Sequence, residues 1–457
     1  MHDDRSPPTA LYSWYVVGVL TLAYIVSFID RQILSLLIEP IRRDLGLSDF
    51  QMAWIGPPAF ALCFLMFGLV FGNLADRTNR TRLLAPGLAI WCLMTAWCAF
   101  ADSALEMFIA RLGVGLGEAV LAPCALSMIS DLFPRERVGK PIAVYSMGVS
   151  LGSSAALIVG SALIVWLEGI DHDPFIEIGV TATWRETFLL VGLPGMALLP
   201  LLLLMREPPR RERLKSGNSV SLKDTWQFLL TNRRVYLPLF LGKAVFAVIA
   251  NAHFWIIPMF ERTWGWSRPR AGTLWGATLL FCGITGVMLG GWLSDRWYQS
   301  GKRDGALVTV WIALLVTIPL HAIAPLMPSG ELAMLLFAPV LIAIGAGSSA
   351  GSTATILVTP NEFRGQMTAL SLLIAGGLGQ FVGPTSVAAL TDFFFRDPAS
   401  LRYSLSAVVL TFSLVALAVL TWGRRHYRAS LAKLERDLAA PVAERAQSDS
   451  SSWRRAR

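Results

Sequence analysis

Two short stretches decide the fold of this chain: GNLADR at residues 72–77 and GWLSDR at residues 291–296. Each follows a long apolar block and shares a glycine, a leucine and a final Asp-Arg pair. A second pair, PRERVG at 134–139 and PNEFRG at 360–365, recurs in the same order, two apolar blocks further along. Because both pairs are separated by nearly the same length of chain, they indicate an internal duplication. Parallel repeats of this kind are typical of one transporter architecture, with its site between the halves.

The composition indicates a membrane protein. Of 457 residues, 54% are hydrophobic and only 15% are charged, whereas soluble proteins carry roughly 25% charged residues. Blocks of roughly 20 apolar residues match the thickness of a bilayer core. We therefore expect an all-α membrane protein whose transmembrane helices form two six-helix, pseudo-symmetric bundles. The predicted helices span 14–38, 51–75, 82–101, 104–132, 140–167, 187–205, 235–260, 271–294, 306–327, 332–358, 366–392 and 402–423.

The loops predict the domain boundaries and the orientation. We expect a cytoplasmic N-terminus (1–13), a first bundle (14–205), a basic cytoplasmic linker (206–234), a second bundle (235–424) and a basic, partly disordered cytoplasmic tail (425–457). Lys and Arg are concentrated in alternate loops and in the tail, and the positive-inside rule assigns those segments to the cytoplasm. The sequence therefore predicts a multi-pass inner-membrane protein with both termini cytoplasmic.

The basic tail has a more specific prediction of its own. Residues 428–440 could form a short basic amphipathic helix lying on the anionic leaflet. The residues after it are polar and low in hydrophobicity, which is typical of disorder.

Several classes of function are disfavoured. The net charge of +8 comes from short loops and the tail, so we expect no nucleic acid partner. All five cysteines lie in apolar blocks without metal-ligand spacing, and no nucleotide-binding loop is present. The G-x-S-x-G pattern at 347–351 lies inside a span of small residues, away from the strand-to-helix turn that a serine hydrolase needs. We therefore expect no enzyme activity, no metal and no cofactor beyond a proton gradient, in a monomer whose partners are its substrate and the bilayer.

The motifs themselves resemble those of a known family. Residues 72–82 are similar to the loop motif of the major facilitator superfamily, and residues 111–118, an arginine followed by glycines, resemble its helix 4 motif. Within it the chain is most similar to the spinster group, on the stretches SFIDRQ (27–32), RLGVGLGE (111–118) and DLFPRER (131–137). That group carries lysolipids and sphingoid phosphates. The fifth span lacks the Gly-Pro pair of many drug antiporters, so drug antiport is less favoured.

Four charged residues inside the predicted spans are the main functional candidates. Asp30 and Arg31 lie in the first span, and Arg111 and Glu118 are seven residues apart on one face of the fourth. Intramembrane charges are costly and are functional by default. A carboxyl group in a low-dielectric cavity can take up and release protons, which makes Asp30 and Glu118 candidate proton-coupling residues. The guanidinium groups of Arg31 and Arg111 match a phosphate or carboxylate. The alternative is a structural ion-pair network.

The seventh span adds two weaker candidates for substrate binding, Asn251 and His253. Residues two apart on a helix diverge by about 200°, so only one of them can face the cavity squarely. Hydrogen bonds between packed helices are an equally good explanation for both.

The resemblance also implies a conformational gate, in which Asp76 and Arg80 latch the two halves on the cytoplasmic side when the protein opens outward. A charge cluster made in one state and broken in the other biases a two-state equilibrium. The candidate gate residues are Asp76, Arg77, Arg80, Asp131, Arg137, Asp295 and Arg296.

These observations predict a secondary active transporter, coupled to protons, that moves a lysolipid or sphingoid-phosphate-like amphiphilic anion by alternating access. One alternative is a proton-coupled carrier of a small organic carboxylate, such as a sugar acid or an aromatic acid. Another is a lipid flippase with no ion coupling.

Overall fold

The computed structural model describes residues 9–134, 137–170, 180–210 and 222–439. Within these ranges the chain is helical and forms twelve spans long and apolar enough to cross a membrane. Their bounds are Ala10–Asp44, Asp49–Gly68, Arg80–Phe100, Ala104–Leu132, Gly139–Glu168, Thr183–Leu203, Arg233–Trp264, Arg268–Gln299, Gly305–Leu326, Gly330–Val358, Asn361–Phe395 and Pro398–Arg436.

The first six spans contain several interrupted helices. They are α1 (Ala10–Gln32), α2 (Leu34–Asp44), α3 (Asp49–Ile55), α4 (Pro57–Arg77), α5 (Arg80–Trp97), η1 (Cys98–Phe100), α6 (Ala104–Glu118), α7 (Leu121–Leu132), α8 (Gly139–Glu168), α9 (Thr183–Gly192), η3 (Leu193–Ala197) and α10 (Leu198–Leu203).

The last six spans repeat this pattern after a connecting helix, α11 (Leu222–Thr231). They contain α12 (Arg233–Ala252), η4 (His253–Trp255), α13 (Ile256–Trp264), α14 (Arg268–Gln299), α15 (Gly305–Ile323), η5 (Ala324–Leu326), α16 (Gly330–Val358), α17 (Asn361–Ala389), η6 (Leu390–Phe395), η7 (Pro398–Ser400) and α18 (Leu401–Ala439).

Side chains at the helix starts fix where the spans begin. Thr9, Asn79, Ser103 and Ser329 each accept a hydrogen bond from a backbone N–H three residues on. Ser48 forms a full capping box with Gln51 at the start of α3. Such caps satisfy amide groups that a helix leaves unpaired at its first turn.

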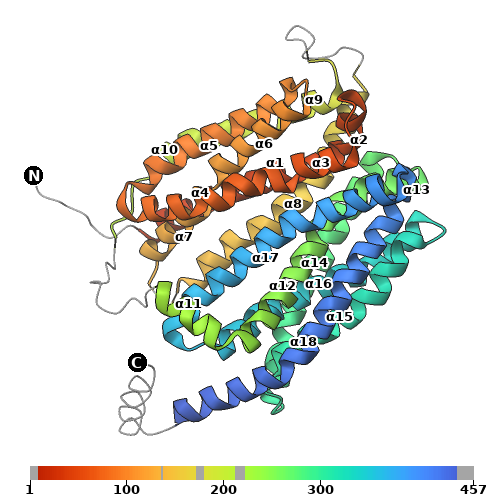
Figure 1. Cartoon of the computed structure of the whole chain (residues 1–457). Helices are drawn as coiled ribbons and strands as arrows, with labels where there is room; N and C mark the ends of the chain where they lie inside the picture. Colours follow the sequence, from red (N-terminus) through yellow and green to blue (C-terminus); the bar gives the residue numbers. More distant parts are fainter. Residues whose placement is uncertain (1–8, 135–136, 171–179, 211–221, 440–457) are drawn as a thin grey trace, which may run out of the picture.

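The two halves form separate layers that meet along two seams. Figure 1 shows α1 to α10 (red to yellow) packed against α11 to α18 (green to blue). Helix α8 packs against α14, and α3 and α4 pack against α17. The first seam requires glycine: a Cβ atom at Gly276 of α14 would lie 2.9 Å from the Leu157 Cβ of α8. Small residues of this kind let membrane helices approach closely.

The bundle has two ends. The terminal face is the end at which α1 begins and α18 ends, and the opposite face is the end at which α2, α9 and α13 lie (Figure 1). Among the described residues, polar contacts between the two halves lie at the opposite face. One of them is the ion pair between Arg268 of α14 and Glu168 of α8, at 2.9 Å.

The twelve predicted spans and the two-bundle fold are confirmed, with most edges within a few residues of the predicted ones; the last span ends at Arg436 rather than at residue 423. The tail differs from its prediction. Instead of a separate surface helix, α18 runs unbroken to Ala439. Its extension is held because the Nε atoms of Arg424 and Arg428 donate to the Asp304 carboxylate at 2.9 and 2.7 Å. Burial raises the pKa of Asp304 and these hydrogen bonds lower it, and the net effect is a pKa below the ordinary value.

Four of the predicted segments fall partly outside this description. Residues 1–8 of the predicted N-terminus lie outside it, as do residues 135–136 and 171–179 of the first bundle. The linker contains α11, but residues 211–221 lie outside the described part, as do residues 440–457 of the predicted disordered tail. The domain boundaries therefore remain a prediction.

Candidate functional site

A cavity of about 290 Å³ lies between the two halves. Spans 1, 2 and 4 of the first half and spans 7 and 11 of the second contribute to its wall. The rings of Phe28, Phe60 and Phe254 form its apolar part. Its polar groups include Arg31, Gln32, Ser35, Arg111, Asn251 and Gln380.

Helix breaks coincide with this cavity. Helix α1 ends at Gln32, α6 ends at Glu118 and α12 gives way to the 3₁₀ turn η4 at His253. Discontinuous helices at membrane depth are tolerated where they line a cavity, and they commonly form transporter binding sites. The breaks therefore mark the same place in the fold as the buried charges do.

Arg31 and Glu118 form an ion pair at the cavity wall. The Arg31 Nε donates to the Glu118 Oε2 at 2.6 Å, and the same oxygen accepts from the Ser27 Oγ at 2.5 Å. The Arg31 side chain is 20% exposed, whereas that of Glu118 is fully buried. Arg31 therefore lies on the cavity side of the ion pair, and Glu118 lies on the side away from the cavity.

Aromatic rings surround the Arg31 guanidinium group. Its central carbon lies 4.7 Å from the ring centroid of Phe28, 4.2 Å from that of Phe60 and 4.8 Å from that of Phe64. Cation–π contacts of this kind are strongest where water is excluded. They fix a planar, permanently charged group beside an apolar surface, which suits a ligand that has both an anionic and an apolar part.

Arg111 and Asp30 meet through the backbone rather than as an ion pair. The Arg111 Nη1 donates to the backbone carbonyl of Asp30 at 3.1 Å. Both carboxylate oxygens of Asp30 are buried, and neither has a hydrogen-bond partner within the described part of the chain. Arg111 lines the cavity, whereas neither Asp30 nor Glu118 is among the described lining residues. The structure thus groups all four predicted residues, with both arginines toward the cavity and both acids behind them.

The second half contributes neutral polar groups. Asn251 lines the cavity and its Nδ2 donates to the Ala247 carbonyl of its own helix at 2.8 Å. Its side-chain carbonyl oxygen therefore remains available to the cavity. Gln380 of α17 lies on the same wall, and sequence reasoning missed it because a single glutamine in an apolar span carries no motif.

The other residue predicted on span 7, His253, is buried and is not among the residues that line the cavity. Its Nε2 lies 3.0 Å from the Nε2 of His321 in α15. The two rings are parallel, and Trp275 and Phe337 pack against them edge-on. The 200° divergence from Asn251 explains this, because Asn251 faces the cavity and His253 then faces its own bundle. Its position does not support the predicted contact with substrate.

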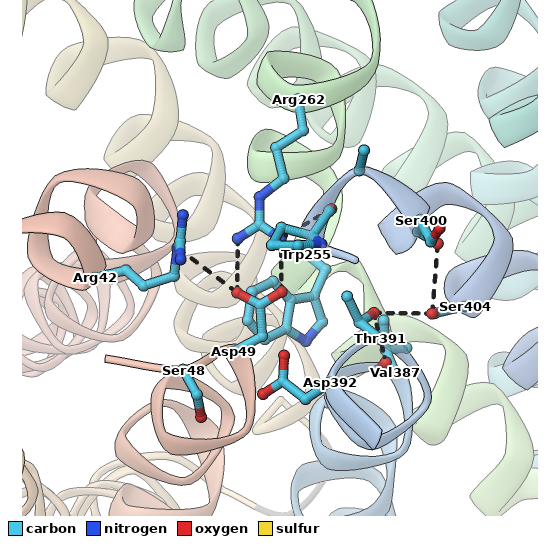
Figure 2. A network of polar contacts seen from close by, with 12 residues as sticks. Arg42, Ser48, Asp49, Trp255, Arg262, Val387, Thr391, Asp392, Ser400 and Ser404 are labelled. Atoms are coloured by element: carbon cyan, nitrogen blue, oxygen red, sulfur yellow. Dashed lines mark hydrogen bonds and ion pairs between the residues drawn. The ribbon is translucent and has the colours of Figure 1, made fainter. Parts of the chain in front are cut away.

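Sequence reasoning also missed a buried charge cluster at the opposite face. The Arg262 of α13 donates to the Glu39 Oε1 at 2.6 Å and to both carboxylate oxygens of Asp49 at 2.6 and 2.7 Å. Figure 2 shows the Asp49 contacts, with Asp392 of η6 close by. The Asp392 carboxylate accepts from the Phe50 N–H at 2.7 Å. These contacts join the two halves. The sequence did not single out their residues, because charged residues are common at the ends of membrane spans.

The predicted gate at the terminal face is only partly assembled. The Arg80 Nη1 donates to the Asp131 Oδ2 at 2.5 Å, and its Nε donates to the Glu207 Oε1 at 2.6 Å. Arg80 and Asp131 belong to the first half, and Glu207, which was not predicted, lies at the start of the predicted linker.

The remaining gate candidates are more exposed than Arg80 is. They are exposed at the terminal face: Asp76, Arg77, Arg137, Asp295 and Arg296. The latch was predicted for the state that opens at the opposite face. In this structure the two halves are joined at the opposite face instead, so the predicted latch at the terminal face stays a proposal.

Twelve membrane spans in two similar halves, with a charged cavity between them, define a membrane transporter of the two-bundle type. The comparison with known families makes this specific. The Major Facilitator Superfamily model matches residues 20–384. The chain belongs to the major facilitator superfamily.

Relatives agree with the predicted resemblance to the spinster group. The chain is 29% identical over 403 residues to an MFS-type efflux pump of Mycolicibacterium smegmatis, covering 87% of this chain and 88% of that protein. It is 24% identical over 420 residues to protein spinster of Drosophila melanogaster, covering 86% and 66% of the two chains.

A solved structure extends the likeness to the fold. It is a bacterial homologue of the human lysosomal transporter spinster in an inward-facing, occupied conformation, with a TM-score of 0.82 and 26% identity. The match covers 93% of this chain and 99% of that one. The predicted resemblance is confirmed.

Proposed function

We propose that this transporter moves an amphiphilic organic anion of the lysolipid or sphingoid-phosphate type, coupled to protons, by alternating access. One observation carries the proposal: two arginines and several phenyl rings line the same cavity between the halves. A guanidinium group pairs with a phosphate or carboxylate in a planar, two-point manner. The rings of Phe28, Phe60 and Phe254 offer the apolar surface that a hydrocarbon chain requires.

Arg31 is the proposed switch between substrate and acid. In this structure its charge is paired with Glu118 at 2.6 Å. An anionic headgroup that approaches the same guanidinium competes with that carboxylate. Protonation of Glu118 would release Arg31 for the headgroup, because a neutral carboxyl group holds the cation less strongly than a carboxylate does.

Asp30 is the second proposed proton site. Its carboxyl group has no hydrogen-bond partner among the described residues, and Arg111, which touches its backbone, lines the cavity. A buried carboxyl group of this kind can change protonation only together with its surroundings. Movement of the halves would supply that change, which is how proton binding and alternation become coupled.

The orientation follows from the loop charges. With the terminal face in the cytoplasm of the inner membrane, as the positive-inside rule favours, the Arg262 cluster closes the periplasmic side and the structure is inward-facing. Outward opening would break that cluster and assemble the predicted gate around Asp76 and Arg80. We propose that one chain suffices for this cycle, as a monomer without a bound cofactor.

The test is transport by purified protein in liposomes. Uptake of a labelled lysophospholipid is compared with uptake of a labelled sugar acid, each with and without an imposed pH gradient. We expect saturable lysophospholipid transport that the gradient accelerates. Lysophospholipid uptake no faster than in protein-free liposomes would refute the proposed substrate, and uptake indifferent to the gradient would favour an uncoupled flippase.

A second candidate is a proton-coupled carrier of a small organic carboxylate. The cavity of about 290 Å³ lies at the lower end of the usual range for ligand sites, about 300–1,000 Å³, which suits a small solute. A relative 23% identical over 297 residues is the "Probable L-galactonate transporter" of Escherichia coli. Gradient-driven uptake of the sugar acid alone would favour this candidate in the same experiment.

A further inference from the structure

A second cavity, of about 620 Å³, opens on the outside of the second half, between η6 with the end of α17 and the facing part of α18. Its wall is apolar and includes Leu390, Phe393, Phe394, Val408 and Phe412. Phe393 and Phe394 are 63% and 73% exposed. In a chain that spans a membrane, we expect exposed rings at the end of a span to face lipid rather than water. We call this cavity the α17–α18 groove.

A π-helical turn shapes one side of the groove. The end of span 11, η6 (Leu390–Phe395), is a π-helix, and π-turns inside membrane or soluble helices often occur at functional sites. The turn ends at Arg396, whose φ of 56° is left-handed, an uncommon conformation for a residue with a side chain. A hydrogen bond of 2.8 Å from the Thr391 Oγ1 to the Ser404 Oγ ties the turn to α18 (Figure 2).

Two positive charges lie where the chain passes from η6 to α18. Arg396 is exposed, and Arg402 stacks on the ring of Tyr403 at 4.6 Å while donating to its hydroxyl at 2.6 Å. The nearest acid along the chain, Asp397, accepts instead from the Ala399 N–H and the Ser400 hydroxyl. No carboxylate pairs with either arginine in the described part of the chain, so neither charge is neutralised by an acid there.

From this arrangement we propose that the α17–α18 groove binds one anionic phospholipid of the surrounding bilayer. An acyl chain fills the apolar groove, and Arg396 and Arg402 bind the phosphate of the headgroup. A guanidinium group binds a phosphate through short, charge-assisted hydrogen bonds. The groove shares no lining residue with the central cavity, so the lipid bound there is distinct from the transported substrate.

The test is native mass spectrometry of the full chain, delipidated in detergent and then titrated with phosphatidylglycerol or phosphatidylcholine of the same acyl chains. We expect one tightly held lipid and a preference of about tenfold for phosphatidylglycerol, since each arginine near a headgroup contributes modestly. The double variant Arg396→Gln, Arg402→Gln should lose that preference.

The matched control is Arg270→Gln. Arg270 also lies at the opposite face and stacks on a ring, Trp266, but it is paired with Glu331. This variant should keep the wild-type preference. Equal binding of the two lipids by the wild type, or an unchanged preference in the double variant, would overturn the headgroup assignment.

A second variant tests the groove itself. Ala407→Trp places an indole in the groove wall, and it should reduce binding of both lipids if the acyl chain lies there. Thermal unfolding of the variant confirms that it is folded. Wild-type binding of both lipids by the folded variant would show that the groove is not the site.

Discussion

The two halves of this transporter share an architecture, yet they present different chemistry to the cavity between them. The first half supplies two arginines at the wall with two acids buried behind them, Arg31 and Arg111 with Asp30 and Glu118. The second half supplies the amides of Asn251 and Gln380. Duplication therefore conserved the scaffold, while the charged chemistry is concentrated on one side. We expect substitutions in the first half to abolish or uncouple transport and those in the second to tune affinity.

The largest effect is expected for Glu118→Gln. This change removes the charge that Arg31 is paired with, and breaking a buried ion pair costs about 3–5 kcal/mol. Because Arg31 is partly exposed, we expect the lower end, about 3 kcal/mol, in the free energy of unfolding. Gradient-driven uptake should be lost, because the amide cannot take up and release the proton that the proposed cycle requires.

The matched control is Glu331→Gln, which also breaks an arginine pair, but an exposed one. It should transport at the wild-type rate in the same liposome assay. A Glu118→Gln rate within a few-fold of wild type would remove the ion pair from the mechanism.

Arg31→Ala is expected to act mainly on substrate affinity. A hydrogen bond to a charged group contributes about 1.5–3 kcal/mol, so KM should rise by about ten- to 100-fold. Arg31→Lys should recover only part of this, because an ammonium group lacks the two-point geometry of a guanidinium group. The measurement is the concentration dependence of uptake.

Arg185→Ala provides the control for that measurement. Arg185 also pairs with a carboxylate, that of Asp102, and stacks on a ring, but it lies outside the cavity. Its KM should equal that of the wild type. If Arg31→Ala shared that unchanged KM, the headgroup site would have to be elsewhere.

Asp30→Asn is expected to separate transport from the pH gradient. The amide keeps the shape of the side chain but cannot take up the proton. We expect exchange of labelled for unlabelled substrate to persist, while the acceleration by an imposed gradient disappears. Exchange and gradient-driven uptake measured in one preparation test this, and acceleration equal to that of the wild type would assign coupling to another group.

Substitutions in the second half should be milder. A neutral hydrogen bond contributes about 0.5–1.5 kcal/mol, so Asn251→Ala and Gln380→Ala should each raise KM by less than about tenfold. The maximal rate should stay near that of the wild type. If either change were as severe as Arg31→Ala, the asymmetry between the halves would be wrong.

The smallest effect on transport is expected for His253→Gln. Its imidazole contacts His321 and lies outside the cavity, so KM should change by less than about twofold. The change should instead lower the thermal unfolding temperature, because the buried His321 ring loses a hydrogen-bond partner. A raised KM with an unchanged unfolding temperature would return His253 to the substrate site.

Sequence patterns anticipated the spans and the four central charges for a simple physical reason. Hydrocarbon excludes charge and unpaired backbone, so apolar blocks predict helices, and a residue such as Asp30 inside one stands out. Helical periodicity also anticipated that Asn251 and His253 point in different directions. Both inferences rest on local rules that hold before the helices are packed.

Features made by packing between distant segments could not be anticipated in this way. Arg262 meets Glu39 and Asp49 only because the two halves meet at the opposite face. Glu207 reaches Arg80 across the first half, and the His253–His321 pair depends on how α15 packs beside span 7. Charges at span ends and lone polar residues are too common in membrane proteins to reveal such partners.

The most direct test of the central claim is proton movement driven by substrate. Liposomes that contain the transporter and a pH-sensitive dye receive a lysophospholipid gradient at equal internal and external pH, beside protein-free liposomes as the control. We expect an internal pH change in the wild type that is absent from Asp30→Asn. Wild-type transport of the lysophospholipid without any pH change would contradict proton coupling through the buried acids of the first half.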